Sequence, residues 1–143
     1  MAKELISPTE FADFVRTFRQ AVVATVSPAG APEAALVEMA VTDEGDLVFD
    51  TKSEASKVDN LAHNARVAIV VGWGGRVSVQ VEGEAELLTG EERQQFSALY
   101  AEQFPARPPV NELFTIYRVR PAWLRYCEAA PVGPPIVVEG SWA

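Results

Sequence analysis

The chain has 143 residues, a length that fits one domain with a single hydrophobic core, so we predict one domain over residues 1–143. Its 12 basic and 20 acidic residues give a net charge of -8. That sign opposes binding to nucleic acid or to an anionic membrane, and neither is expected as a partner. A small anionic ligand remains compatible with it, because a local cluster of hydrogen-bond donors can outweigh the overall field.

The single cysteine, Cys127, excludes an intramolecular disulfide and a CxxC motif for zinc or redox exchange. We expect a buried or half-buried thiol. The first residues, MAKELISPTEF, lack the apolar core of a signal peptide, and no apolar run approaches the roughly 20 residues of a membrane span. The sequence therefore predicts a cytoplasmic protein.

A first helix is predicted from Pro8 to about Arg19. Ser7 precedes Pro8, and Glu10 follows Ser7 by three residues, which is typical of a capping box. Apolar residues recur on one face of this helix at helical spacing: Phe11, Phe14, Val15 and Phe18. We expect that face to pack on the body of the protein.

Seven β-rich segments follow, separated by turn signatures such as SPAG (27–30) and DEGD (43–46). The predicted strands cover residues 21–26, 32–41, 47–51, 66–71, 76–88, 114–119 and 123–128. In the 76–88 segment valines alternate with polar residues, so its two faces meet different environments. The proline-rich tail after Pro131 is not expected to form a central strand.

Two helices interrupt these strands. Ser53 is predicted to cap a short helix that ends near Asn64. Its buried side is expected to hold Val58, Leu61 and Ala62. The TGEE pattern from Thr89 to Glu92 predicts a second capping box and a helix to about Gln103. Strands joined mostly by tight turns, with helices between them, predict a mainly β (α+β) fold: an antiparallel barrel of six or seven strands with flanking helices.

The best candidate site is the start of the helix predicted from Ser53 to about Asn64, TKSEASK (51–57). Free backbone N–H groups and the positive end of the helix dipole favour an anion there, and the hydroxyl groups add donors. Lys57 in the first turn opposes the dipole by about 0.3–1 kcal/mol, which a nearby anion would explain. The alternative is that Lys57 pairs with Glu54 and that Ser53 only caps the helix.

Other residues are weaker candidates. Ser78 and Gln80 share one side of their strand, where they either hydrogen-bond the edge of a heterocycle or form a solvated face. Trp73, between glycines, either stacks on a ring or fills an oligomer contact. His63, the only histidine, has no partner at the spacing of a catalytic triad or a metal site, so a polar surface role is predicted. We predict no metal site and no catalytic residue.

Four segments together resemble the split-barrel flavin proteins related to pyridoxamine 5'-phosphate oxidase: ATVSPAGAP, DLVFDTKSEASKVDNLAHNARVAIVV, VQVEGEAELL and YRVRPAWLRY. The resemblance covers about residues 11–128. It implies a split β-barrel and a homodimer in which FMN lies in a groove between the two chains. A small molecule would be the substrate.

The resemblance also implies roles for single residues. The FMN phosphate would be met by Thr51, Ser56 and Lys57, with Asp50 beside them among the cofactor contacts. Backbone of the second strand would line the isoalloxazine at Ala35, Leu36 and Val37. Ser78 and Gln80 would contact the ring from the long strand. Arg125 would recognise an anionic group of the substrate, the alternative being a surface charge at a strand end.

The chain departs from the oxidase pattern at Ala35 and Ser56, which replace two basic residues, and at Trp123 and Arg125, which replace an Arg-x-His pair. Each lost charged hydrogen bond is worth roughly 1.5–3 kcal/mol. Our hypothesis is an FMN-dependent oxidoreductase in which the flavin carries out the redox chemistry, without pyridoxamine phosphate oxidation. The alternatives are a non-enzymatic flavin- or haem-binding module and a deazaflavin-dependent reductase on the same barrel.

Overall fold

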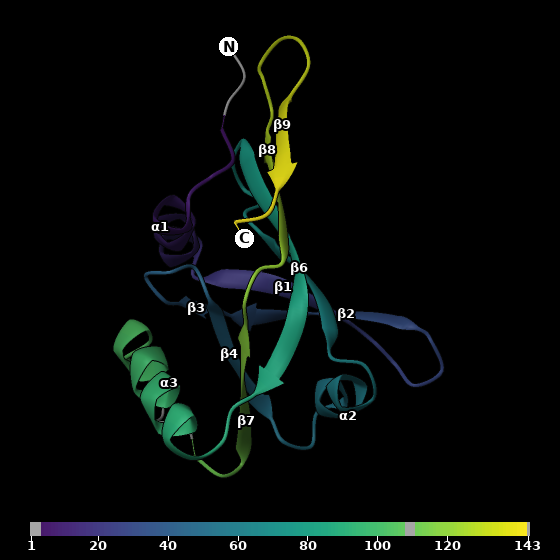
Figure 1. Ribbon diagram of the computed structural model, residues 1–143, viewed down its shortest axis with the longest axis vertical. Coiled ribbons are helices and arrows are strands. Elements are labelled where there is room, and N and C mark those ends of the chain that lie inside the picture. The colour runs from purple at the N-terminus through teal and green to yellow at the C-terminus, as the bar shows by residue number, and fades with distance from the viewer. Residues whose placement is uncertain (1–3, 108–110, 143) are drawn as a thin grey trace.

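The computed structural model describes residues 4–107 and 111–142, which form one antiparallel, nine-stranded curled sheet with helices around it (Figure 1). The strands are β1 (Gln20–Val26), β2 (Pro32–Glu38), β3 (Ala40–Val41), β4 (Leu47–Lys52), β5 (Arg66–Val71), β6 (Val77–Leu87), β7 (Phe114–Val119), β8 (Trp123–Glu128) and β9 (Ile136–Gly140). The helices are α1 (Pro8–Phe18), α2 (Ser56–His63) and α3 (Gly90–Gln103). The predicted fold class is confirmed.

Seven strands follow one another in the order β2-β1-β5-β6-β7-β4-β3, and β8 and β9 extend the sheet from β6. The first part of β6 lies between β5 and β8, whereas its last residues pair with β7. This long strand therefore belongs to both halves of the split barrel. Gly83 marks the change of partner, because a Cβ there would lie 2.8 Å from the carbonyl oxygen of Arg120.

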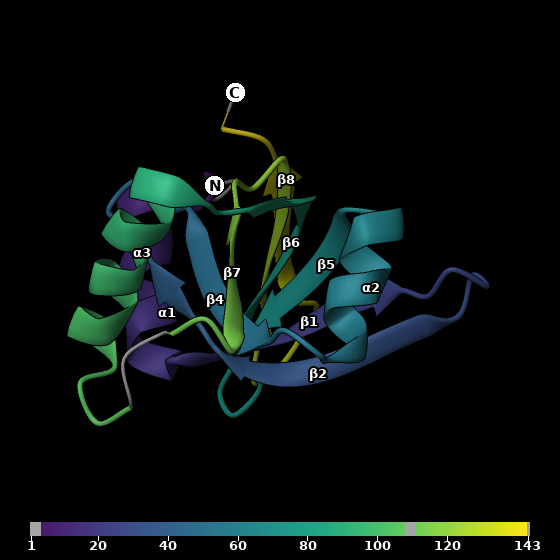
Figure 2. The same cartoon turned by 90° about the horizontal axis from the view of Figure 1, so that it is seen from below.

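Two apolar layers stabilise the sheet. The larger fills the concave side and includes Leu47 and Phe49 of β4 together with the buried face of α1. The second lies between α3 and the other face of β4, where Val48 packs against Phe96 and its neighbours. Figure 2 shows α1 and α3 at one side of the curled sheet and α2 at the other. Successive β4 residues therefore point to different layers, as the pleat of a strand requires.

One face of the sheet half formed by β2, β1, β5, β6, β8 and β9 carries exposed or half-buried side chains, and we call it the outer face. Strand pairing places six of its residues in one row across the sheet: Leu36, Val22, Val70, Gln80, Arg125 and Glu139. The neighbouring row is Ala34, Ala24, Ala68, Glu82 and Trp123. Neighbouring strands lie about 4.8 Å apart, so each row is a line of adjacent side chains.

The helix-start predictions had mixed outcomes. The capping box of α1 is confirmed, with Ser7 and Glu10 each accepting a hydrogen bond of 3.1 Å from the other's backbone N–H. The predicted Ser53 cap is wrong: α2 begins at Ser56, and the Ser53 hydroxyl lies 2.9 Å from that of Thr115. No side chain caps the first turn of α2.

The second predicted capping box, at the start of α3, is also wrong. Thr89 occupies the N-cap position, but its side chain makes no capping hydrogen bond. Glu92, which would complete the box, instead pairs with Arg118 of β7 at 3.2 Å. A tertiary ion pair thus replaces the local one.

Strand predictions differ from the structure in two places. The segment 32–41 divides into β2 and β3, because buried Met39 leaves the ladder and donates its N–H to the carbonyl of Arg19. The proline-rich tail returns as β9, which pairs with β8 alone and is thus an edge strand, compatible with the exclusion from the sheet centre. In α2, Ala62 is exposed and Asn60 is buried, which corrects the predicted buried side.

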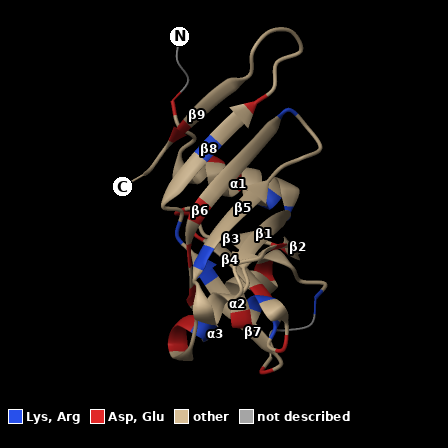
Figure 3. Cartoon of the chain, turned by 90° about the vertical axis from the view of Figure 1, so that its right-hand side faces the viewer, with Lys and Arg blue, Asp and Glu red and all other residues tan. Residues whose placement is uncertain are grey.

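Cys127 is half-buried and His63 is exposed, as predicted. None of the helices in the described residues has the length and apolar character needed to cross a bilayer. The loop between β8 and β9 projects from the sheet and carries no charged residue (Figure 3).

Candidate functional site

The start of α2 carries two cations without acidic partners. Within residues 4–107 and 111–142, neither Lys52 nor Lys57 has a carboxylate oxygen within 4.0 Å. The alternative pairing of Lys57 with Glu54 is therefore not formed. Thr51, at the end of β4, is 8% exposed and lies at the base of this segment. Uncapped N–H groups and two unpaired ammonium groups make this segment suited to an anion.

Most of the arginines, unlike these lysines, have an acidic partner. Five of them lie within 4.0 Å of a carboxylate: Arg16, Arg107, Arg118, Arg120 and Arg125. Their charges are compensated within the chain. Among the described residues, Arg19, Arg66, Arg76 and Arg93 also have no carboxylate within 4.0 Å, so the lysines are distinguished by their position: both lie within six residues of each other at one helix start.

Strand β2 lies beside this helix and has a free edge. It pairs with β1 alone among the described strands, so one row of its N–H and C=O groups has no partner strand. Ala35 and Val37 point to the same side as Glu33, which contacts α2, while Leu36 points to the outer face and is 56% exposed. The backbone of Ala35, Leu36 and Val37, which was predicted to contact the ring, therefore lies at an open sheet edge.

The remaining predicted ring and substrate residues meet on the outer face. Gln80 of β6 lies directly opposite Arg125 of β8, and Ser78 lies opposite Cys127 in the next row. Arg125 donates from Nε to Glu139 of β9 at 3.0 Å. Its guanidinium therefore already has one carboxylate partner, on a strand that the sequence did not reveal. An anionic substrate group would share or replace that partner.

Asp50 is placed differently from the other candidates. It alternates with Thr51 along β4, so its side chain faces the α3 layer, where Arg107 Nη1 lies 3.0 Å from Oδ1. Arg107 also donates to the hydroxyl of Tyr100, which is 2% exposed. Burial and the nearby Asp50 charge raise the pKa of Tyr100. The Asp50 carboxylate is thus engaged, and only its backbone remains for a cofactor.

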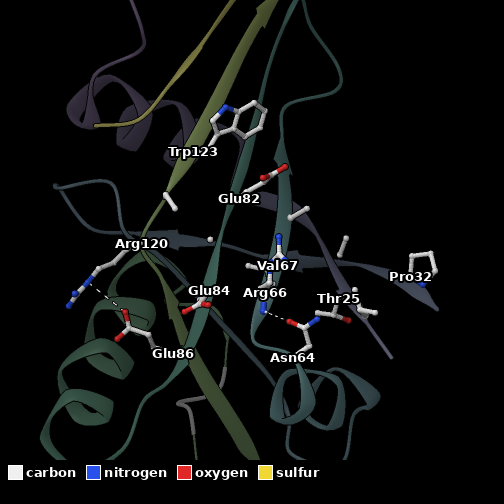
Figure 4. A pocket seen from close by; sticks show the side chains of 15 residues that line it. Thr25, Pro32, Asn64, Arg66, Val67, Glu82, Glu84, Glu86, Arg120 and Trp123 are labelled. Carbon is white, nitrogen blue, oxygen red and sulfur yellow. Dashed lines mark hydrogen bonds and ion pairs between the residues drawn. The ribbon is translucent and has the colours of Figure 1, made fainter. Parts of the chain in front are cut away.

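A groove of about 910 Å³ runs over one end of the outer face (Figure 4). Its lining includes Ala24 and Ala68, Trp123 lies at one end, and Glu82 and Glu84 project from β6. Arg120 and Glu86 form an ion pair at its other side. The groove borders the Gln80 row but is not lined by residues 51–57. The candidate phosphate residues and this groove are therefore separate.

A sequence model of the family described as pyridoxamine 5'-phosphate oxidase matches residues 7–128. The chain belongs to this family. Curated oxidase-family relatives include a pyridoxine/pyridoxamine 5'-phosphate oxidase of Burkholderia thailandensis, 32% identical over 105 residues, and one of Burkholderia mallei, 31% identical over 105 residues. Each alignment covers 65% of this chain and 49% of the relative. The chain thus spans about half the length of these relatives.

Solved structures show the same pyridoxamine 5'-phosphate oxidase-like fold. A heme binding protein from Mycobacterium smegmatis superposes with a TM-score of 0.77 at 20% identity, covering 97% of this chain and 60% of that one. A pyridoxamine 5'-phosphate oxidase-related, FMN binding protein from Nostoc punctiforme superposes with a TM-score of 0.65 at 16% identity, covering 93% of both chains. The fold thus occurs in proteins described as flavin-binding, heme-binding and oxidases.

Two residues at this site were missed in the sequence. Asn60 is 2% exposed and bonds α2 to the sheet, and Arg107 holds Asp50 from the loop after α3. The sequence did contain a signal for Asn60. It is a polar residue that lies three positions after Lys57, and therefore one turn further along the same face of the helix, next to the apolar Leu61. Arg107 lies 57 residues from Asp50, and no local pattern predicts such a pair.

Proposed function

We propose that this chain binds FMN with the phosphate at the start of α2 and acts as a flavin-dependent oxidoreductase. The observation that carries the proposal is the pair of unpaired cations, Lys52 and Lys57, at an uncapped helix start in an acidic chain. A phosphate there would receive backbone N–H groups, the Ser56 hydroxyl and an ammonium group. Lys52 offers a second cation in a chain that has Ala35 and Ser56 in place of two basic residues of the family pattern.

The free edge of β2 supports a position for the isoalloxazine. Backbone groups of Ala35, Leu36 and Val37 would hydrogen-bond the ring, as main-chain groups at an unpaired edge can do for any partner. Ser78 and Gln80 of the same chain lie three strands away from β2, so these residues would contact the ring from a second copy of the chain. When bound, the flavin supplies hydride or electron transfer, while these residues hold and orient it.

We further propose that a second copy covers the outer face. Its part on β2, β1 and β5 is apolar: Val22, Ala24, Ala68 and Val70 lie there, and Leu36 at 56% exposure continues them onto β2, whereas Gln80 and Glu82 of β6 are polar. An exposed apolar sheet face of this kind favours association. A flavin at the β2 edge would then lie at the seam between two chains.

Haem binding is the second candidate, favoured by the likeness to the heme binding protein of Mycobacterium smegmatis. A haem iron commonly takes a histidine ligand. His63, the only histidine, is exposed at the end of α2, and its Nδ1 lies 3.0 Å from the carbonyl oxygen of Asp59. His63 lies at the opposite end of α2 from Lys52 and Lys57, so haem and FMN would bind at different ends of this helix.

The visible absorption spectrum of freshly purified protein, and of protein incubated with FMN or hemin and then passed through a desalting column, tests the proposal. We expect a retained yellow flavin spectrum. Protein that retains hemin and no flavin would support the second candidate and contradict the first. Equilibrium dialysis against a deazaflavin and FMN together tests for a deazaflavin-dependent reductase, for which preferential deazaflavin retention is required.

Turnover separates an enzyme from a binding module. The FMN-loaded protein is mixed with NADH or NADPH and a dye acceptor, and reduction of the flavin is followed by its absorbance. We expect bleaching of the flavin and reduction of the dye. If the protein holds FMN but neither NADH nor NADPH reduces the bound flavin, it is a flavin-binding module and not an enzyme that uses these donors.

A further inference from the structure

A buried amide ties α2 to two strands at once. Asn60 donates from Nδ2 to Oγ1 of Thr25 at 2.9 Å and to Oε1 of Glu33 at 2.8 Å. Thr25 of β1 and Glu33 of β2 are directly opposite each other in the strand ladder. The two amide hydrogens thus cross-link one helix to both arms of the β1–β2 hairpin, in a position 2% exposed to solvent.

Helix α2 depends on such a tether for its orientation. It has eight residues, and isolated helices of this length are not stable in water. No side chain caps its first turn, and its buried face consists of Asn60 and Leu61, with Val58 half-buried. Apolar contacts are non-directional, whereas two hydrogen bonds from one amide group fix both the rotation and the distance of the helix.

The tether lies close to the cationic start of the same helix. Asn60 follows Lys57 by three residues and Ser56 by four, the spacings that place side chains on one face of a helix. Its partner Glu33 is two residues before Ala35 on β2, on the same side of that strand. Asn60 therefore connects the helix start to the strand whose edge is proposed to line the ring.

We infer that Asn60 is a positioning residue of the phosphate site: it holds α2 against the β1–β2 hairpin so that the N–H groups, Ser56 and Lys57 meet the phosphate while β2 lines the ring. This inference rests on the proposed function. It assigns Asn60 to phosphate recognition and not to the affinity for the ring. FMN and riboflavin differ only in the phosphate, so the ratio of their affinities measures this role directly.

The test is the FMN and riboflavin dissociation constants of the full chain and of Asn60→Ala, measured by quenching of flavin fluorescence. We expect FMN affinity to fall about tenfold and riboflavin affinity to stay within twofold. An equal loss of affinity for FMN and riboflavin, which leaves the ratio of their dissociation constants unchanged, would overturn the inference. A wild-type protein that binds FMN and riboflavin equally would refute the phosphate site itself, and with it the inference. Failure of the proposed function is thus seen in the wild-type protein, whereas failure of the inference alone is seen only in Asn60→Ala.

A matched control removes an amide tether elsewhere. Gln103 donates to the carbonyl of Val41 at 2.7 Å and accepts from its N–H at 3.1 Å, far along the chain from α2. We expect Gln103→Ala to lower thermal stability without changing the FMN to riboflavin ratio. A ratio that changes as much in Gln103→Ala as in Asn60→Ala would show that the effect follows lost stability, against the inference.

Three further variants keep the test decisive if Asn60→Ala does not fold. Thr25→Val removes one acceptor with little change of shape and is expected to lower the ratio about threefold. Asn60→Asp sets a carboxylate against that of Glu33, and adding Glu33→Gln restores a donor and an acceptor in reversed order. We expect the ratio to fall in the single variant and to recover in the double one; failure to recover would count against positioning by this hydrogen bond.

Discussion

Single side chains at the start of α2 carry most of the proposed affinity for a phosphate. Lys57 lies in the first turn, has no acidic partner among the described residues, and is half-buried, so its ammonium group can meet an anion without first leaving an ion pair. Lys52 and Ser56 flank it. The sequence singled out this segment as a candidate site, but it did not predict whether the cations would lack acidic partners.

Lys57→Ala is expected to lower FMN affinity about tenfold, a loss of roughly 1.4 kcal/mol. Titration of FMN fluorescence at constant ionic strength measures it. Arg76→Ala is the matched control, because Arg76 is an exposed cation in the β5–β6 turn with no carboxylate within 4.0 Å among the described residues. If both variants lose the same affinity, the effect is one of net charge, and Lys57 is not at the site.

The ion pair of Arg107 with Asp50 is the second test at this scale. Arg107→Ala leaves the Asp50 carboxylate, 7% exposed, without its partner, and should cost about 1–3 kcal/mol of unfolding free energy. Urea denaturation measures the loss. Arg125→Ala breaks the exposed pair with Glu139 and is expected to cost less than about 1 kcal/mol. Equal costs for the two variants would contradict the structural role assigned to Asp50.

At the scale of elements, local signals predicted what local contacts decide. The α1 capping box forms because Ser7 and Glu10 are three residues apart at the helix start, where each accepts a hydrogen bond from the other's backbone N–H. Ser53 and Glu92 fit the same sequence rules, but Thr115 and Arg118 engage them from β7. Strand β9 lacked a signal because prolines precede it and its pairing with β8 is a tertiary contact.

The change of partner along β6 provides the test at this scale. Gly83→Ala places a methyl group 2.8 Å from the carbonyl oxygen of Arg120 and should cost about 1–3 kcal/mol of stability, because backbone must move to admit it. Gly74→Ala is the control, since a Cβ there meets nothing within 4 Å. Chemical denaturation compares the two. A Gly83→Ala protein as stable as Gly74→Ala would contradict the close crossing of β6 and the β7–β8 connection.

At the scale of the whole molecule, alternating burial and tight turns predicted the class of fold correctly, since they report which faces are buried. They did not predict which strands become neighbours, such as β6 with both β7 and β8. Nor did they reveal that Leu36, Gln80 and Arg125 share one row on an uncovered face. That row appears only when four strand pairings are known together.

The proposed dimer is tested on that face. Leu36→Arg sets a charge among apolar side chains and is expected to convert a dimer into a monomer, because burying an unpaired charge is strongly unfavourable. Light scattering coupled to size exclusion measures the mass. Leu87→Arg is the control, an equally exposed leucine at 58% near the far end of β6. A wild-type monomer, or a dimer that survives Leu36→Arg, would refute the outer face as the interface.

The central claim is that an otherwise acidic protein compensates a dianionic phosphate at residues 51–57. The most direct measurement is the ratio of the dissociation constants of wild-type protein for riboflavin and for FMN at one ionic strength. Two cations and uncapped N–H groups predict FMN binding at least tenfold tighter, a difference of about 1.4 kcal/mol or more. Equal affinity for the two flavins would contradict the claim.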